Sequence, residues 1–291
     1  MFENVIAGWK LAASIRKLVF KDRGLFIYPI VSGLVIFVET ILILIPFLFL
    51  SNNNSIAFIV GLFIYYVIIY FTSIFIVVSM LLAFKSFEKG KKIGFFEALG
   101  QTASGYALVI LEWAVFEAIV TMVIKALESR GRGGINLTAL LAGLGISIAM
   151  SVIQVFAIPV IIEKKTGPIA TIKESVGFIT RNFGQTFGGL LFTDLYSILF
   201  IVAGIVVIIL AIGLIVLTGS FILMAIVGIM GLLLIVYGAM LNYMLANVYK
   251  LILYDSATGG KLPEGITKEM VQSGIKKPAQ APNPPSQPGI Q

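Results

Sequence analysis

Four carboxylic acids fall inside long apolar stretches of the chain: Glu39, Glu112, Glu117 and Asp194. Acidic residues at membrane depth are functional candidates by default, because proton and cation pathways are built from them. Glu39 and Glu117 lie nearest the middle of their stretches, so they are the first candidates for handling protons or cations. Glu112 is a further candidate. We expect Asp194 to be a cap close to the membrane surface.

Small and polar residues recur at helical spacing on several of these stretches, so each set shares one helix face. The sets are Ser32, Glu39 and Pro46; Tyr65, Thr72 and Ser79; Gly143, Ser147, Ser151 and Gln154; and Gly228, Gly231, Gly238 and Asn242. Asn242 therefore joins the candidate ion- or proton-handling residues. Glu112 and Glu117 lie about 140° apart around a helix, so they do not face one site together.

Helix packing explains the same faces without any ion. Small residues let helices approach closely in lipid, and an interhelical hydrogen bond contributes only about 0.6–2 kcal/mol. A protonated Glu bonded to a Ser or Asn of the next helix is then a structural element. The sequence leaves the structural and the ion-handling interpretation open.

The composition excludes most enzyme classes. The chain has no His and no Cys, which removes imidazole bases, thiolate nucleophiles and the usual zinc ligands. Tyr254-Asp255 lacks the Gly-x-Gly-Asp partner that an intramembrane aspartyl protease needs. We therefore expect no enzyme, no catalytic residue, no resident metal and no cofactor.

Length and hydropathy predict an all-α, polytopic integral membrane protein. Of 291 residues 59% are apolar and 12% charged, and the mean hydropathy is +1.04. A span needs roughly 20 apolar residues. Six stretches qualify, and they form three hairpins: 25–50, 56–84, 106–124, 137–162, 190–217 and 221–253. The turn between the last two is predicted at Thr218-Gly219-Ser220.

Basic residues predict the orientation. The net charge is +7, and all of the 21 Lys and Arg residues except Lys125, Arg130 and Arg132 flank one side of the predicted spans. We expect the protein to lie in the plasma membrane. The positive-inside rule then places both termini in the cytoplasm. The scattered basic residues favour anionic lipid headgroups over nucleic acid as partners. The expected headgroup contacts are Lys10, Arg16, Lys17, Lys91, Lys92, Lys164 and Lys165.

A short motif indicates an internal repeat. Gly100-Gln101-Thr102 with Gly105 recurs as Gly184-Gln185-Thr186 with Gly189. This predicts a transmembrane domain over 1–253 made of three parallel units, about 1–84, 85–162 and 163–253. Each unit is an amphipathic interfacial helix followed by a helical hairpin. The segment 254–291, with its Pro-rich end, is expected to be a cytoplasmic tail.

The first interfacial helix is predicted from Phe2, Val5, Ile6, Trp9 and Ala13, which recur at helical spacing. The N-terminal segment has no compact apolar run and no small-residue cleavage site, so we do not expect a cleaved signal peptide.

Two stretches carry a resemblance to a known family. One runs from Ile161 through Glu163-Lys164-Lys165-Thr166-Gly167-Pro168 to Arg181-Asn182-Phe183-Gly184. The other runs from Asn247-Val248-Tyr249 through Ala257-Thr258-Gly259-Gly260 to Pro263. With the Trp9 segment that leads to Tyr28-Pro29, they resemble an uncharacterised family of six-span membrane proteins of archaea and bacteria. That family is distantly similar to the membrane domain of some glycerophosphodiester phosphodiesterases. The resemblance implies the fold and transfers no activity.

Two functions remain after these exclusions. The first, which the sequence favours, is a transporter or channel-like protein in which Glu39 and Glu117 handle protons or cations. The second is a noncatalytic scaffold or accessory subunit that binds lipids or a partner complex through its basic face. A water-filled path to Glu39 would favour the first, and a dry, packed bundle the second. The expected protein partners are a second copy of the chain or another membrane protein.

Overall fold

Every element of the described structure is a helix. The structure is a computed structural model, and it describes residues 2–50, 55–129, 154–260 and 262–267. The elements in chain order are α1 (Phe2–Val19), η1 (Arg23–Phe26), α2 (Ile27–Glu39), η2 (Thr40–Leu44), α3 (Ile45–Leu50), α4 (Ser55–Glu88), α5 (Phe95–Ser129), α7 (Ala157–Lys164), α8 (Pro168–Thr218) and α9 (Phe221–Ala257). The all-α prediction is confirmed for these residues.

Five helices in the described part of the chain are long and apolar enough to cross a membrane. They cover Arg23–Leu44, Ile56–Glu88, Phe95–Ala126, Pro168–Thr218 and Phe221–Ala257. Most of the sixth expected span, 137–162, lies outside the described residues, and its last part is the short helix α7. The six-span arrangement therefore stays a prediction.

The amphipathic segments do not all form separate helices, which corrects one expectation. The second and third continue directly into the spans of α5 and α8. No Pro interrupts either junction, so the helical hydrogen bonds run on. In α8 the change of direction occurs at Asn182, whose backbone leaves the helical region (φ −119°, ψ 24°) while its Nδ2 donates to the Phe178 carbonyl oxygen.

Helix α1 packs on protein as well as facing outward. Its buried residues are Ala7, Leu11, Ala12, Ile15, Leu18 and Val19, whereas Ile6 and Trp9 of the predicted face are exposed. The helix therefore packs on protein through a side other than that of Ile6 and Trp9, and the contact of the predicted face with lipid stays a prediction. Gly8 lets the two backbones meet: a Cβ atom there would lie 2.3 Å from the Gln185 carbonyl oxygen of α8. Trp9 also makes an edge contact with Phe192, at 4.8 Å between ring centroids.

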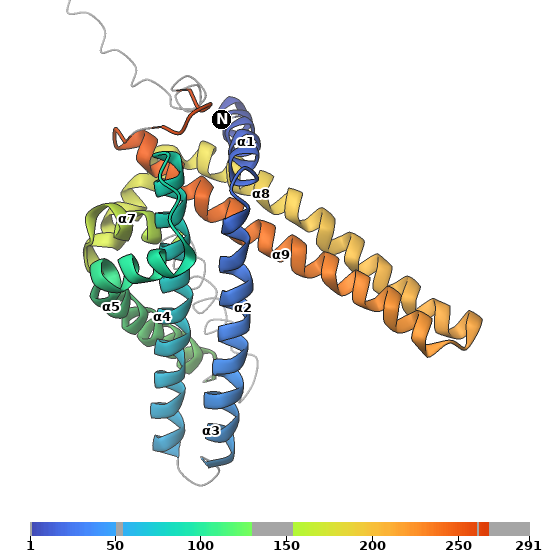
Figure 1. The fold of residues 1–291 in the computed structure, drawn as a ribbon. Coiled ribbons are helices and arrows are strands. Elements are labelled where there is room, and N and C mark those ends of the chain that lie inside the picture. The colour runs from blue at the N-terminus through green and yellow to red at the C-terminus, as the bar shows by residue number, and fades with distance from the viewer. Residues whose placement is uncertain (1, 51–54, 130–153, 261, 268–291) are drawn as a thin grey trace, which may run out of the picture.

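Helices α8 and α9 form a long hairpin that diverges from the direction of α2 and α4 (Figure 1). The turn between them lies where the sequence predicts it. Gly219 takes a left-handed conformation (φ 65°), and the Ser220 side chain accepts a hydrogen bond from the Leu223 amide.

Glycines set the spacing between α8 and α9. A Cβ atom on Gly231 would lie 2.7 Å from the Gly204 carbonyl oxygen, and one on Gly238 would lie 2.8 Å from that of Ser197. The predicted small-residue face of α9 therefore packs against α8, as close helix pairs in lipid do.

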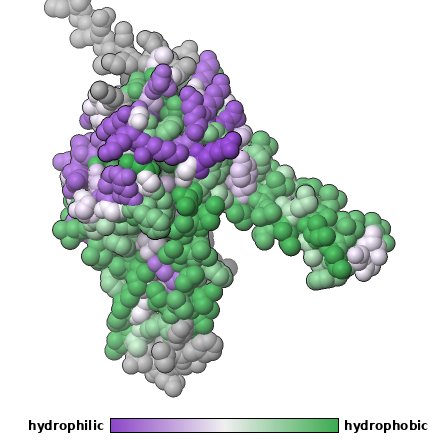
Figure 2. All heavy atoms as spheres, in the orientation of Figure 1, coloured by the Kyte–Doolittle hydropathy of each residue, from purple (hydrophilic) through white to green (hydrophobic). Residues whose placement is uncertain are grey.

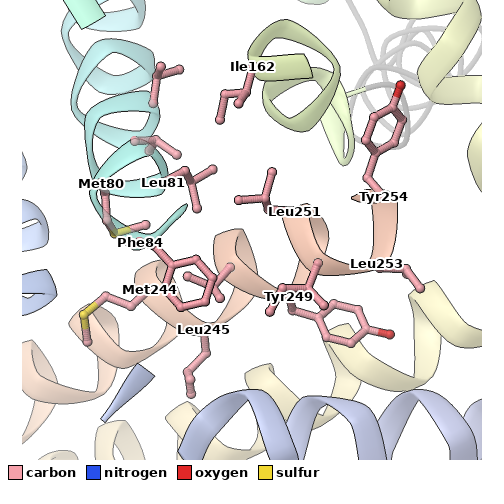
Figure 3. Close-up of a cluster of buried hydrophobic side chains, with 14 of the residues drawn as sticks. Met80, Leu81, Phe84, Ile162, Met244, Leu245, Tyr249, Leu251, Leu253 and Tyr254 are labelled. Atoms are coloured by element: carbon pink, nitrogen blue, oxygen red, sulfur yellow. The ribbon is translucent and has the colours of Figure 1, made fainter. Parts of the chain in front are cut away.

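The apolar core lies at the end of the molecule where α4, α7 and α9 meet, as Figure 3 shows for Leu81, Ile162 and Leu251. Phe178 of α8 stacks obliquely on Tyr254 there, at 5.2 Å. Figure 2 shows hydrophilic residues over the same end, while the helices that lead away from it are largely hydrophobic. We call this the basic end. It is formed by α1, the 85–94 segment, α7, the first turns of α8 and the last turns of α9.

The hairpin packing gives a matched pair of variants. Gly231→Ala places a methyl group against the backbone of α8, so we expect it to lower the free energy of unfolding by about 1–3 kcal/mol. Gly213→Ala adds the same group where no atom lies within 4 Å, and we expect no loss. Thermal melting of the detergent-purified protein measures both. Equal melting temperatures would contradict the close α8–α9 contact.

Candidate functional site

Glu39 ends α2 and faces α4. Thr72 Oγ1 donates to its Oε1 at 2.6 Å, while Oε2 is buried and has no hydrogen-bond partner among the described residues. The next five residues, Thr40–Leu44, form a π-helical turn. Such turns widen a helix and recur at functional sites. Thr40 Oγ1 lies 3.1 Å from the Tyr65 hydroxyl, so Tyr65 and Thr72 share the α2-facing side of α4 as predicted.

Ser79 lies on that face by its seven-residue spacing from Thr72, but it meets a different helix. Its hydroxyl donates to Thr102 Oγ1 of α5 at 2.8 Å. Ser32 is buried on α2. Of the predicted stripe on the fourth span, Gly143, Ser147 and Ser151 lie outside the described residues, and Gln154 is exposed.

Glu117 is buried within α5, with 8% of its surface exposed. The indole Nε1 of the fully buried Trp113, one turn earlier, donates to its Oε1 at 2.5 Å. One turn later, Thr121 Oγ1 lies 2.7 Å from the hydroxyl of Tyr70 on α4. Glu117 therefore belongs to a polar seam between α4 and α5.

The two acids lie on different sides of α4. Tyr70 points to α5 and Thr72 points to α2, and residues two apart are about 200° apart around a helix. The structure does not bring Glu39 and Glu117 to one site.

The other two candidates lie near helix contacts. Glu112 is exposed, and a Cβ atom on Gly167 would lie 3.0 Å from its Oε2. Gly167 is the N-cap of α8, where a negative charge is favoured by the helix dipole. Asn242 of α9 donates to Asp194 Oδ1 of α8 at 3.0 Å, so this pair links the hairpin.

The predicted headgroup residues all lie at the basic end. Lys10, Lys17, Lys91, Lys92, Lys164 and Lys165 are exposed. Three have partners: Lys92 pairs with Asp22 at 3.1 Å, Lys164 pairs with Glu174 at 2.8 Å, and Lys165 Nζ lies 4.5 Å from the Tyr106 ring centroid. Arg16 is half-buried, with its guanidinium 4.7 Å from the Tyr196 ring centroid. No ion pair is described for Lys10, Lys17 or Lys91.

Lys85 joins three helices at the basic end. It forms ion pairs with Glu163 of α7 and with Asp255 of α9, at 3.0 Å for the latter. These residues line a cavity of about 670 Å³ together with Glu88, Lys89 and Glu264. No group of three acidic side chains in the described residues has the geometry to hold a metal ion.

A second cavity, of about 830 Å³, lies between the start of α8 and the ends of α7 and α9. Its charged lining residues are Lys164, Lys173, Glu174 and Arg181. A third, of about 360 Å³, lies between η1 and the 92–95 segment and includes Asp22 and Lys92. Neither Glu39 nor Glu117 lines any of these three cavities.

Comparison with known families assigns the chain. The model of a family of unknown function, DUF6159, matches residues 55–263. The chain belongs to the DUF6159 family. No curated protein and no solved structure matches it. The expectation that the chain belongs to a family of unknown function is thus confirmed. The six spans of that family and its likeness to phosphodiesterase membrane domains stay predictions.

The matched range contains α4 to α9 of this DUF6159 member, including the Lys85 ion pairs, the 830 Å³ cavity and every lining residue of the 670 Å³ cavity except Glu264. Helix α2 with Glu39 and helix α1 with Lys10 precede it. Sequence reasoning missed Lys85, Glu163 and Asp255 as a group, and Lys173 and Arg181 as cavity residues. The available signal was their position at predicted helix ends on one side of the membrane.

The ion pairs of Lys85 can be tested against its neighbour in the same cavity. Lys85→Gln leaves Glu163 and Asp255 without their cation, and because all three are partly exposed we expect a loss of about 1–3 kcal/mol in the free energy of unfolding. Lys89→Gln removes an exposed charge for which no ion pair is described, so it should have little effect. Chemical denaturation in detergent measures both. Equal losses would show that general charge, and no specific pair, matters there.

Proposed function

We propose that this DUF6159 protein is a noncatalytic membrane scaffold or accessory subunit whose basic end binds anionic lipid headgroups. The observation that carries the proposal is the gathering of exposed lysines at one end of a set of apolar helices (Figure 2). The proposed orientation places this end, with both termini, at the cytoplasmic surface of the plasma membrane. There the anionic leaflet attracts each Lys or Arg by about 1 kcal/mol.

The placement of the buried acids supports this choice over a conduit. A path through the membrane needs polar groups that converge, yet Glu39 and Glu117 lie on different sides of α4. Each is also engaged by a neighbour, Thr72 or Trp113. The three cavities described above lie at the basic end.

The lysines without described ion pairs give the direct test. We expect Lys10→Gln, Lys17→Gln and Lys91→Gln together to reduce the preference for anionic lipid about threefold or more, because each contributes up to about 1 kcal/mol near the surface. The measurement is the selectivity of the reconstituted protein for spin-labelled phosphatidylglycerol over phosphatidylcholine. The matched control carries Arg at the same three positions and keeps the charge. A triple Gln variant with unchanged selectivity would refute the proposal.

Native mass spectrometry of the protein, released gently from its own membrane, separates scaffold from conduit. A monomer that carries stoichiometric lipid or a second protein supports the scaffold. A closed homo-oligomer without other subunits favours the conduit.

Proton or cation handling at Glu39 is the second candidate function. It is favoured by the buried Oε2 without a described partner and by the adjoining π-helical turn. If Glu39 carries protons, Glu39→Gln abolishes the dissipation of an imposed proton gradient by liposomes that contain the protein. Glu112→Gln, which changes an exposed acid of α5 beside the start of α8, leaves it intact. Equal rates in the wild type, both variants and empty liposomes would eliminate this candidate.

A further inference from the structure

The 830 Å³ cavity at the kinked start of α8 has an excess of positive charge. Its lining includes three cations, Lys164, Lys173 and Arg181, and one carboxylate, Glu174. Lys164 is paired with Glu174 at 2.8 Å. No ion pair is described for Lys173 or Arg181, although Arg181 attracts Glu174 electrostatically, so the lining keeps a net excess of two positive charges.

The walls of the cavity are held in place by contacts between three helices. Glu174 forms an ion pair with Lys164 at the end of α7. It also accepts a hydrogen bond from the Tyr254 hydroxyl of α9, at 3.2 Å. Phe178 packs between Phe156 and Tyr254, at 4.4 Å and 5.2 Å between ring centroids. The cations therefore lie on a wall whose side chains are already held by aromatic contacts and an ion pair. Fewer side chains then have to be ordered when a ligand binds.

One side of α8 lines the cavity, and a neighbouring side is apolar and exposed. Ala170, Lys173, Gly177 and Arg181 recur at helical spacing along the lining. Ile169, Phe183 and Phe187 are exposed outside the lining, with Ile169 at 82%, and Val176 is an exposed apolar residue of the lining itself. Val176 lies about 60° around the helix from Lys173. This is the arrangement of an interfacial helix, with cations at headgroup level and apolar side chains toward the acyl region.

Lys173 and Arg181 are eight residues apart, about 12 Å along the helix axis. A single phosphate diester carries one negative charge, whereas two phosphates match the excess charge, and the long Lys and Arg side chains can converge on two neighbouring phosphates. We propose that this cavity is a specific site for an anionic phospholipid whose headgroup carries two phosphates, with Lys173 and Arg181 each binding one. This inference rests on the proposed function and deepens it, from a basic end that attracts anionic lipid to one defined site.

The test is a lipid titration of the detergent-purified full chain, followed by native mass spectrometry. The lipids are cardiolipin, which has two phosphates, phosphatidylglycerol, which has one, and phosphatidylethanolamine. We expect one cardiolipin to bind at least about tenfold more tightly than phosphatidylglycerol, since a second charge-assisted contact is made. Equal affinity for cardiolipin and phosphatidylglycerol would overturn the two-phosphate assignment.

Charge variants locate the site. We expect Lys173→Gln with Arg181→Gln to weaken cardiolipin binding about tenfold or more, at up to about 1 kcal/mol for each charge plus the lost hydrogen bonds. Lys21→Gln with Lys89→Gln removes the same charge outside this cavity, and it should change cardiolipin binding less than about twofold, because neither lysine lines the cavity and the attraction falls off within a Debye length. Equal losses in the two double variants would overturn the site and leave general lipid attraction standing. A wild type without any preference for anionic lipid would instead refute the proposed function itself.

A second pair changes shape without changing charge. A Cβ atom on Gly177 has no atom within 4 Å. Gly177→Ala should therefore bind cardiolipin like the wild type, and Gly177→Leu should block the cavity and lose the bound lipid. Melting temperatures confirm that both variants fold. If Gly177→Leu retains its lipid, the cavity is not the site.

Inorganic pyrophosphate tests whether the ligand is a lipid or a free phosphate compound. We expect millimolar pyrophosphate to leave cardiolipin bound, because the exposed apolar side chains beside the cavity hold the acyl chains. Displacement of cardiolipin by pyrophosphate at equal concentration would overturn the lipid assignment in favour of a soluble polyphosphate.

Discussion

The ion pairs of Lys85 hold the basic end together, and the rest of the arrangement depends on that end. Lys85 connects α4 to Glu163 of α7 and to Asp255 of α9, which are distant in sequence. The apolar core lies beside these pairs, where α4, α7 and α9 meet (Figure 3). Water contributes a hydrophobic driving force at this end, whereas lipid tails contribute none between the spans. The helices are therefore fixed relative to one another at the membrane surface, and α8 and α9 diverge from α2 and α4 beyond it (Figure 1).

Within the apolar segments, pairs of helices are joined one contact at a time. Glycines bring α8 and α9 together, hydroxyls join Tyr70 to Thr121, and Thr72 engages Glu39. Apart from Glu39 Oε2, the polar groups of these pairs are used in local contacts, as expected where lipid offers no hydrogen-bond partner. This distribution suits a protein whose interacting polar groups lie at the basic end. The acids of the apolar helices are held in separate helix pairs, so they do not converge on one path.

The sequence predicts the features that depend on local pattern. The apolar runs give the five described spans, Gly219 and Ser220 give the turn of the last hairpin, and the spacing of Gly231 and Gly238 gives its packing face. Features that depend on distant residues are not readable in this way. Glu112 lies beside Gly167 only because α8 begins next to the middle of α5, and Lys85 pairs with Asp255 only because α4 and α9 end close together. The packing of α1 on α8 is a further feature of this kind, since Gly8 meets the Gln185 carbonyl oxygen, which lies far along the chain. The continuity of α5 and α8 was missed because a change of amphipathic pattern does not by itself end a helix.

The proposed headgroup site belongs to one part of the chain and is not a property of every unit. At the offset that superposes the two Gly-Gln-Thr motifs, Glu97 stands at the position of Arg181 and Ala98 at the position of Asn182. Helix α5 thus lacks both the cation and the amide that bonds to the backbone at the kink of α8. Its Thr102 is engaged with Ser79 of α4, whereas Thr186 and Gly188 lie where α1 crosses α8. The two Gly-Gln-Thr motifs therefore pack against different helices. The kink of α8 places Lys173 and Arg181 before the bend and Phe187 after it, so one helix presents charge at the surface and apolar side chains below.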